Sequence, residues 1–228
     1  MTPVAMISGA NRGIGEAIAR KLLAEGFQVS LGVRAPASAA HLVSEYGEAQ
    51  CFICPYDASV QGSGRSWVEQ TLKRFGHLQA LVNNAGMYGS TTLEGYEDQD
   101  LNMLIQVNTL AVLEVSKAAL PYLEASKGRF VNIVSISGKK YFEGECLGYT
   151  ISKFGAMAVS EILQAHGSPD VQTTAICPGL VNTHMARSLC EVPPEEMIQP
   201  AHVATMVSTV LSLPPTVEIT EIIMNDTT

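Results

Sequence analysis

The chain contains 228 residues and carries a formal net charge of -8 at pH 7. Its 46% hydrophobic and 16% charged residues indicate a globular protein rather than a disordered one. The excess of acidic groups disfavours binding to the phosphate backbone of nucleic acids and to anionic membrane surfaces, so we expect neither as a partner.

Short apolar or β-branched segments alternate with longer helical patterns along the chain. Helical spacing of Ile14, Ala17, Ile18 and Leu22 separates the first two strands, and Gly26 suits a left-handed helix cap. Such βαβ units connect by right-handed crossovers and give a doubly wound parallel α/β sheet with helices on both faces, here in a single domain of residues 1–228. The seven predicted strands are residues 4–8, 28–33, 51–55, 80–83, 130–135, 171–177 and 218–224.

Five widely spread cysteines, with no leader before the first strand, predict reduced thiols and a cytoplasmic protein. Cys51 and Cys54 have the spacing of a metal or redox pair. They lie in a predicted strand, where positions three apart point to opposite faces, so we interpret them as small buried residues and expect no metal site. We expect no apolar run to approach the roughly 18 or more residues that a membrane-spanning helix requires, which predicts a soluble protein.

A glycine-rich turn directly follows the first strand. Gly9, Gly13 and Gly15 would let the backbone turn tightly and approach a pyrophosphate at the N-terminus of the next helix, together with Asn11, Arg12 and Ile14. A turn of this composition can also exist for packing alone, but strand, turn and helix stand where nucleotide binding requires them. We therefore predict a dinucleotide site.

Two further patterns carry polar groups. Asn83-Asn84-Ala85-Gly86 closes the fourth strand, where small and amide side chains could pack against the glycine turn. Tyr149 and Lys153 stand four apart on a predicted helix and share one face. A nearby ammonium favours the phenolate, so we expect Lys153 to lower the pKa of Tyr149.

Residues 180–199 break the alternation between a strand and a helix that opens at Pro200. This segment contains Pro193, Pro194 and three glutamates, and we interpret it as a substrate lid over the site. It is called the 180–199 segment below.

In order and spacing, the glycine turn, Asn83 to Gly86, Ser135 after Val-Asn-Ile-Val, Tyr149-x-x-x-Lys153 and Pro178-Gly179-x-x-x-Thr183 resemble the short-chain dehydrogenase/reductase family. The resemblance covers nearly the whole chain and implies a Rossmann fold. It places the catalytic groups on Asn108, Ser135, Tyr149 and Lys153. Tyr149 would transfer the proton, Ser135 would bond the same substrate oxygen, Lys153 would hold the ribose, and Asn108 would anchor a water.

Ser137 is a rival to Ser135, because both share a face if the strand continues. The sequence context of the family favours Ser135. The C-terminus lacks the Asp-Gly-Gly of many members, which leaves the subfamily open.

The resemblance, together with the residue that follows the second strand, implies NADP(H) as the cofactor. At that position a carboxylate would bind the adenosine ribose of NAD, whereas Arg34 would pair with the 2′-phosphate of NADP, assisted by Arg12. The implied cofactor contacts are Gly9, Asn11, Arg12, Gly13, Ile14, Gly15, Arg34, Asp57, Asn83, Ala85, Gly86, Tyr149, Lys153, Pro178, Gly179 and Thr183.

We expect an enzyme that acts on a small-molecule carbonyl or alcohol and forms a homodimer or homotetramer. A catalytically silent NADP-binding regulator stays open as an alternative. So does a reductase of carrier-bound 3-oxoacyl thioesters, although the acidic 180–199 segment lacks a basic docking surface. Glu143 and Glu145 disfavour an anionic substrate. The predicted substrate pocket is Met87, Tyr141, Cys146, Leu180 and Met185.

Overall fold

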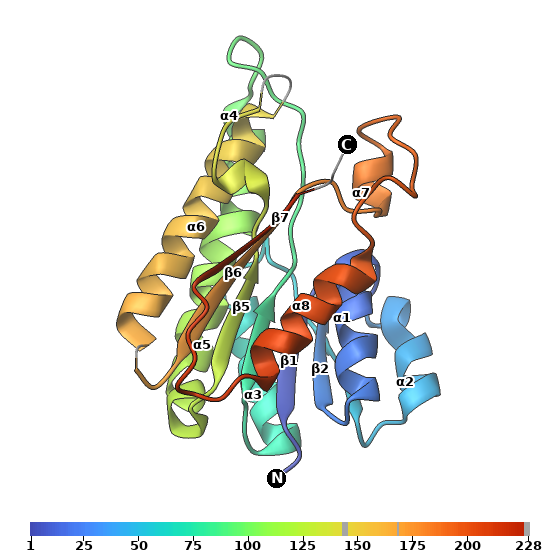
Figure 1. Ribbon diagram of the computed structural model, residues 1–228, viewed down its shortest axis with the longest axis vertical. Helices are drawn as coiled ribbons and strands as arrows, with labels where there is room; N and C mark the ends of the chain where they lie inside the picture. The colour runs from blue at the N-terminus through green and yellow to red at the C-terminus, as the bar shows by residue number, and fades with distance from the viewer. Residues whose placement is uncertain (143–145, 168, 226–228) are drawn as a thin grey trace.

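The computed structural model describes residues 1–142, 146–167 and 169–225. Its strands form one seven-stranded, entirely parallel sheet in the order β3-β2-β1-β4-β5-β6-β7 (Figure 1). The predicted doubly wound α/β fold is therefore confirmed. The strands are β1 (Val4–Ser8), β2 (Gln28–Val33), β3 (Cys51–Pro55), β4 (Ala80–Asn83), β5 (Arg129–Ile133), β6 (Gln172–Pro178) and β7 (Glu221–Met224).

The first four strands have the predicted bounds, and the last three differ. Strand β5 ends at Ile133 because Ser135 caps a short 3₁₀ turn: its hydroxyl accepts a hydrogen bond from the backbone N–H of Ser137 at 3.1 Å. Strand β6 is shifted by one residue toward the C-terminus. Strand β7 begins at Glu221 rather than at residue 218 and pairs only with β6, so it is the edge of the sheet.

Helices cover both faces of the sheet, as Figure 1 shows. One face packs against α1, α2 and α8, and the other packs against α3, α5 and α6. The helical elements are α1 (Gly13–Ala24), η1 (Pro36–Ala39), α2 (Ala40–Tyr46), α3 (Ser63–Phe75), α4 (Asp98–Ile105), η2 (Gln106–Leu110), α5 (Ala111–Ser126), η3 (Ile136–Gly138), α6 (Leu147–Gly167), α7 (His184–Arg187) and α8 (Pro200–Ser212).

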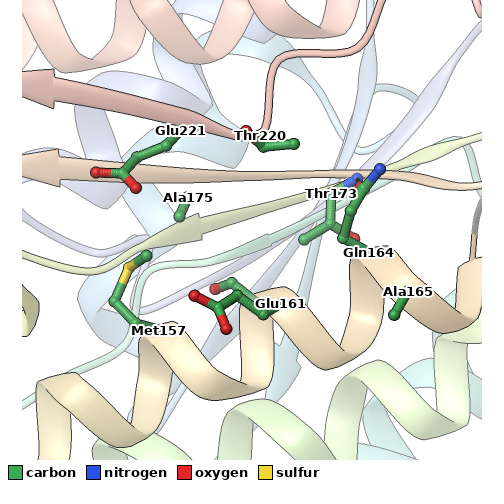
Figure 2. A pocket seen from close by; sticks show the side chains of 9 residues that line it. Met157, Glu161, Gln164, Ala165, Thr173, Ala175, Thr220 and Glu221 are labelled. Carbon is green, nitrogen blue, oxygen red and sulfur yellow. Dashed lines mark hydrogen bonds between the residues drawn. The ribbon is translucent and has the colours of Figure 1, made fainter.

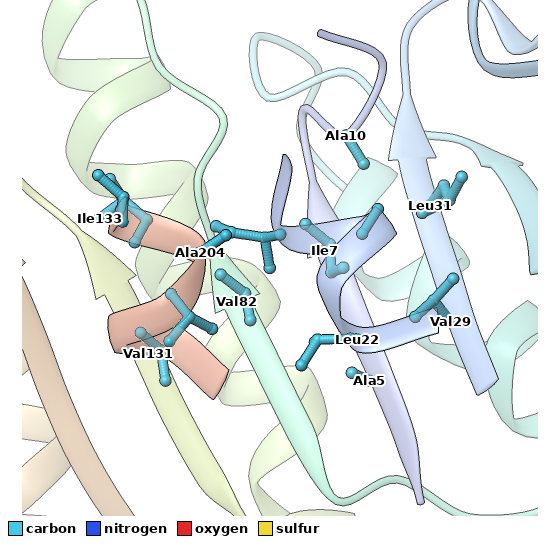
Figure 3. Packing of buried hydrophobic residues seen from close by; sticks show 14 of the residues in the cluster. Ala5, Ile7, Ala10, Leu22, Val29, Leu31, Val82, Val131, Ile133 and Ala204 are labelled. Atoms are coloured by element: carbon cyan, nitrogen blue, oxygen red, sulfur yellow. The ribbon is translucent and has the colours of Figure 1, made fainter. Parts of the chain in front are cut away.

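The two faces divide the core by strand alternation. In β1, Ala5 and Ile7 join the cluster under α1 and α8, whereas Val4 and Met6 join the cluster under α3 and α5. Figure 3 shows the first cluster, to which strand residues such as Ile7 and Val82 and helix residues such as Ala204 contribute. Both faces of the central strands are therefore withdrawn from water, which is the condition a parallel sheet requires.

Helix α1 ends as the sequence predicts, with Gly26 in the left-handed region at φ 87. Cys51 and Cys54 are both buried, and burial raises the pKa of each thiol to about 11. Among the described residues, no group of three or more His, Cys, Asp or Glu side chains could hold a metal ion.

The helical stretch Asp98–Ser126 is long and apolar enough, by length and composition, to cross a membrane, with a mean hydropathy of 1.3. The expectation that no such stretch exists was wrong, because polar residues interrupt each apolar run in the sequence although the mean hydropathy of the stretch is high. This is weak evidence for a membrane, since a helix in the core of a water-soluble protein satisfies the same criterion. Here α5 packs against α3, α6 and β4.

Strand order reverses between β1 and β4: the chain proceeds outward through β2 and β3 on one side and through β5, β6 and β7 on the other. In sheets of this kind, ligands bind outside the carboxyl ends of the strands at that switch point. The glycine turn and Asn84 follow β1 and β4 there.

Candidate active site

The glycine turn is shaped by two glycines that no other residue could replace without strain. Gly9 has φ 65, in the left-handed region. A Cβ on Gly15 would lie closer to the carbonyl oxygen of Gly9 and to the side chain of Asn84 than real Cβ atoms lie to any neighbour. This open backbone at the start of α1 fits the close approach of a pyrophosphate.

The ends of β1 and β4 are joined by reciprocal hydrogen bonds. The Ser8 hydroxyl accepts from the backbone N–H groups of Asn84 and Ala85, both at 2.9 Å. In return, Nδ2 of Asn84 donates to the carbonyl oxygens of Ser8 at 2.9 Å and Gly9 at 3.2 Å. The glycine turn is thus fixed to the end of the neighbouring strand.

Of the two asparagines that close β4, the second and not the first faces the glycine turn. The Asn83 side chain is buried, where its Nδ2 donates to Ser116 at 3.0 Å and to Asn132 at 2.8 Å. The prediction of Asn83 as a cofactor contact is thereby limited to its backbone. Strand alternation could have predicted this, because Asn83 points to the same face of β4 as Leu81, which is buried in the cluster under α3 and α5.

The segment after β6 reaches the same place from far along the chain. A Cβ on Gly13 would lie 3.3 Å from Cγ2 of Thr183. Thr183 caps the short helix α7, and its hydroxyl accepts from the N–H of Ala186 at 3.3 Å. The backbone N–H of Gly179 donates to the carbonyl of Met224, which ties this segment to β7.

The predicted phosphate-binding arginines lie at the surface. Arg12 and Arg34 are both exposed, at the start of α1 and after β2. Asp57 is partly buried after β3, and hydrogen bonds from Ser59, together with the charge of Arg34, lower the pKa of its carboxyl group. Arg34 and Asp57 therefore lie near each other beside the carboxyl ends of β2 and β3.

Tyr149, Ser135 and Lys153 meet beyond the carboxyl end of β5. Nζ of Lys153 lies 5.6 Å from the ring centroid of Tyr149 and donates to the carbonyl oxygen of Ile133 at 3.3 Å. Lys153 is only 6% exposed, and Ser135 is 9% exposed. A hydrogen bond links the Ser135 and Tyr149 side chains. Tyr149 itself stays partly accessible.

The expectation that Lys153 lowers the pKa of Tyr149 was wrong for the protein on its own. Burial raises the pKa of Tyr149 to about 12, and the hydrogen bond from Ser135 offsets only part of that rise. Burial also lowers the pKa of Lys153 to about 8. Desolvation disfavours the charged form of each group.

Asn108 lies in a π-helical turn, Gln106–Leu110, between α4 and α5. Its buried side chain is fully engaged: Nδ2 donates to the carbonyl of Met87 and to the hydroxyl of Ser152, and Oδ1 accepts from the N–H of Met87, each at 2.9 Å. Gly86 lies close to this side chain, because a Cβ on Gly86 would be 3.2 Å from Oδ1 of Asn108. Asn108 thus holds the residues after β4 against α6. The π turn carried no sequence signal beyond an asparagine in a helix.

A family model described as "short chain dehydrogenase" matches residues 3–193. The chain belongs to the short-chain dehydrogenase family.

Individual relatives agree with this assignment. Agropine synthesis reductase of Rhizobium rhizogenes is 33% identical over 218 residues, which are 93% of this chain and 50% of that protein, so the chain spans about half the length of that relative. An uncharacterized oxidoreductase of Staphylococcus aureus is 28% identical over 96% of this chain and 95% of its own. An alcohol dehydrogenase from Thermococcus sibiricus, solved in complex with 5-hydroxy-NADP, has a TM-score of 0.92 and 30% identity, covering 100% of this chain and 97% of that one.

The family is one of dehydrogenases and reductases that use a nicotinamide cofactor. The open turn at Gly9 and Gly15 fits such a cofactor, since only a backbone without side chains permits the approach of its diphosphate. The residues present to hold it are those of the glycine turn, the turn after β4 and Thr183.

The predicted substrate residues occupy different surroundings. Met87 and Leu180 are partly buried, whereas Tyr141 and Met185 are 56% and 37% exposed. Cys146 is partly buried and pairs with Thr91 at the start of α6. Glu143 and Glu145, which were expected to disfavour anions, lie outside the described residues.

A recess of about 270 Å³ lies elsewhere, between α6 and strands β6 and β7 (Figure 2). It contains none of the predicted site residues, so it is separate from the candidate active site. Its lining includes Met157, Glu161, Gln164, Thr173 and Glu221.

Buried Lys153 should make the stability of the cofactor-free protein depend on pH. The unfolded chain keeps the lysine proton up to a pKa of 10.5, whereas the folded chain releases it near 8. Between these values the unfolded state binds more protons, so the free energy of unfolding rises with pH. Chemical unfolding from about pH 7 to about pH 9.5, below the range of Tyr149, should show this contribution as a difference between the wild type and a variant without Lys153, because the buried Cys51 and Cys54 thiols act in the opposite sense in both proteins.

The Lys153→Met variant should lose that pH-dependent gain, because it has no proton to release. Lys73→Met, which changes an exposed lysine on α3, is the control and should keep it. Equal slopes for wild type and Lys153→Met at a fixed protein concentration would contradict the prediction.

Proposed function

We propose that the chain is an NADP(H)-dependent oxidoreductase that interconverts a carbonyl and an alcohol of a small molecule, with Tyr149 as general acid and base. The observation that carries the proposal is the partly accessible Tyr149 phenol, bonded to Ser135 and next to buried Lys153. These groups lie at the carboxyl edge of the sheet, on the same side as the glycine turn.

The roles of the chain's own groups follow from their surroundings. The bound nicotinamide would supply or accept the hydride. During reduction, Tyr149 gives its proton to the substrate oxygen, and the high pKa of its phenol keeps that proton in place until charge develops on the oxygen. The Ser135 hydroxyl donates to the same oxygen. Lys153 holds a positive charge beside the developing phenolate, and Asn108 positions the turn after β4.

Cofactor choice rests on the exposed arginines. Arg34 stands directly after β2, where a carboxylate would favour NAD, and its guanidinium is free to pair with a phosphate. Arg12 lies at the start of α1, next to the glycine turn. The similar alcohol dehydrogenase that was solved with 5-hydroxy-NADP supports the same choice.

We further propose one domain, located in the cytoplasm, in which the 180–199 segment acts as the lid. The base of the segment is closed by a bridge between Val181 and Ile198. The hydrogen bond from Asn182 N–H to the Ile198 carbonyl strengthens that closure. The segment would then swing as a unit over the carboxyl edge of the sheet.

Two functions of other kinds compete with this one. A silent regulator would bind cofactor without turnover, and the combination of an accessible Tyr149 with buried Lys153 favours the enzyme. A reductase of carrier-bound thioesters would need a basic docking face, whereas exposed Glu191, Glu195 and Glu196 lie on the 180–199 segment. In an assay of NADPH absorbance, turnover of a free carbonyl compound would exclude the silent regulator, whereas turnover of carrier-bound but not of free thioesters would favour the third function.

We also propose a homodimer or homotetramer formed through α5 and α6. These helices pack together and expose apolar side chains, among them Leu113, Ile151, Phe154 and Ile162, which are 39% to 47% exposed. Clustered exposed apolar groups of this kind mark association surfaces.

The association surface predicts the effect of a single charge. Phe154→Glu should shift the protein to a smaller species in sedimentation velocity, because a carboxylate cannot be buried unpaired in an apolar interface. Leu93→Glu, at a residue 69% exposed outside α5 and α6, should leave the species unchanged. A wild type that sediments as a monomer would refute the proposed assembly.

Tyr149→Phe should lower kcat by roughly two or more orders of magnitude while folding and cofactor binding persist, since only the proton-transfer hydroxyl is lost. Steady-state kinetics and cofactor titration measure the two effects separately. Tyr122→Phe, at an exposed tyrosine on α5, serves as the control. Near wild-type turnover in Tyr149→Phe would remove the tyrosine from the mechanism.

Arg34→Asp and Arg12→Ala should each weaken NADPH binding by roughly one to two orders of magnitude, because each removes a charged hydrogen bond to the 2′-phosphate. Arg12→Ala should leave NADH nearly unchanged, whereas Arg34→Asp should also favour NADH, because it places a carboxylate at the adenosine ribose. The measurement is kcat/KM for both cofactors. Arg65→Ala, at an exposed arginine on α3, is the matched control. Losses that strike NADH equally would place the arginines away from the phosphate.

A further inference from the structure

The segment of residues 86–91 lies against the start of α6 and is held at both ends. At one end, the Asn108 side chain bonds the N–H and the carbonyl of Met87, both at 2.9 Å. At the other, the hydroxyl of Thr91 accepts from the backbone N–H of Gly148 at 2.7 Å. The segment therefore keeps a fixed position relative to the helix that carries the proposed proton donor.

Tyr88 is the residue of this segment that contacts Tyr149. Their ring centroids are 5.1 Å apart, and the ring planes are tilted by 51°. Within residues 1–142, 146–167 and 169–225, no other aromatic pair includes Tyr149. Tyr88 is partly buried, so part of its ring surface stays accessible beside the reacting hydroxyl.

Residues 86–91 and 146–152 contain no charged side chain. The Lys153 ammonium lies 5.6 Å from the Tyr149 ring centroid, and Cys146 pairs with Thr91 at the start of α6. The face of an aromatic ring is attracted to a nearby cation, so this surrounding suits a flat, neutral, aromatic group.

We propose that Tyr88 is a specificity residue that favours substrates with an aromatic ring attached to the reacting carbonyl carbon. The inference rests on the proposed function and names the substrate class of the same site. A carbonyl oxygen bonded to the hydroxyls of Tyr149 and Ser135 places its substituents beside the ring of Tyr88. An aryl substituent makes an offset or edge-to-face ring contact there that an alkyl ring of similar size does not make.

The reaction balances for an aryl aldehyde. The carbonyl carbon gains a hydride from the reduced nicotinamide, and the carbonyl oxygen gains the proton of Tyr149. The aldehyde becomes a benzylic alcohol, the cofactor is oxidised, and solvent returns the proton to the tyrosine. Tyr88 takes no part in the transfer and acts only by contact with the ring.

The test compares benzaldehyde with cyclohexanecarbaldehyde, which has a ring of similar size without π electrons. The ratio of their kcat/KM values is measured in the wild type, Tyr88→Phe, Tyr88→Leu and the control Tyr96→Leu, at an exposed tyrosine. Intrinsic reactivity cancels when ratios are compared between variants. Tyr88→Leu should lower the ratio roughly two- to tenfold, mainly through the KM of benzaldehyde, whereas Tyr88→Phe and Tyr96→Leu keep it.

A second readout does not depend on turnover. Calorimetric titration with benzamide and cyclohexanecarboxamide, in the presence of NADP, should show the same selective loss for benzamide in Tyr88→Leu. An unchanged ratio in Tyr88→Leu, or equal losses for both ligands, would overturn the assignment and leave Tyr88 a packing residue. Turnover of other carbonyls but of neither aldehyde would also overturn it, whereas no turnover of any carbonyl with either cofactor would overturn the proposed function instead.

Discussion

The arrangement of the site depends on how β1 and β4 are joined at their carboxyl ends. Strand order reverses between β1 and β4, so the chain continues toward opposite edges of the sheet after these two strands. Beyond the last strand residues, no strand-to-strand hydrogen bonds in the described part of the chain hold the two segments together. The Ser8 hydroxyl and the Asn84 side chain supply that connection through four hydrogen bonds. Gly15 has to lack a side chain because Asn84 occupies the space where its Cβ would lie. The geometry of the glycine turn is thus a consequence of the reversal of strand order between β1 and β4.

A second connection extends this order to α6. Asn108 bonds Met87 on the segment after β4 and Ser152 on α6, and the Thr109 hydroxyl donates to the Ser152 carbonyl at 2.8 Å. The π turn allows both residues of the helix to face the same neighbour, which regular α-helical spacing would not do. The helix that carries Tyr149, the proposed proton donor, and the segment that carries Tyr88 are therefore connected by the same amide.

Much of this fold could be predicted from the sequence because parallel strands buried on both faces leave strong apolar runs. That holds for β1 to β4. The end of β5 was misplaced because the Ser135 cap depends on a side-chain hydrogen bond, and the start of β7 was misplaced because an edge strand has one neighbour to define it. The different surroundings of Asn83 and Asn84 could be predicted only by extending the alternation of side chains to Asn83, the last residue of β4. The contact between Tyr88 and Tyr149 has no sequence signal, since it arises from long-range packing.

The protonation of the central pair shows what the fold does to chemistry. A buried ammonium that has no carboxylate partner among the described residues is costly, and the pKa of Lys153 falls to about 8 because burial disfavours its charged form. Tyr149 is affected in the opposite sense, because burial keeps its proton on. The protein alone therefore presents a protonated phenol beside a cation that is mostly retained near neutral pH. That state matches a donor for reduction, whereas oxidation requires a phenolate, which becomes accessible only if the positive charge of Lys153 is stabilised by an additional group of opposite sign.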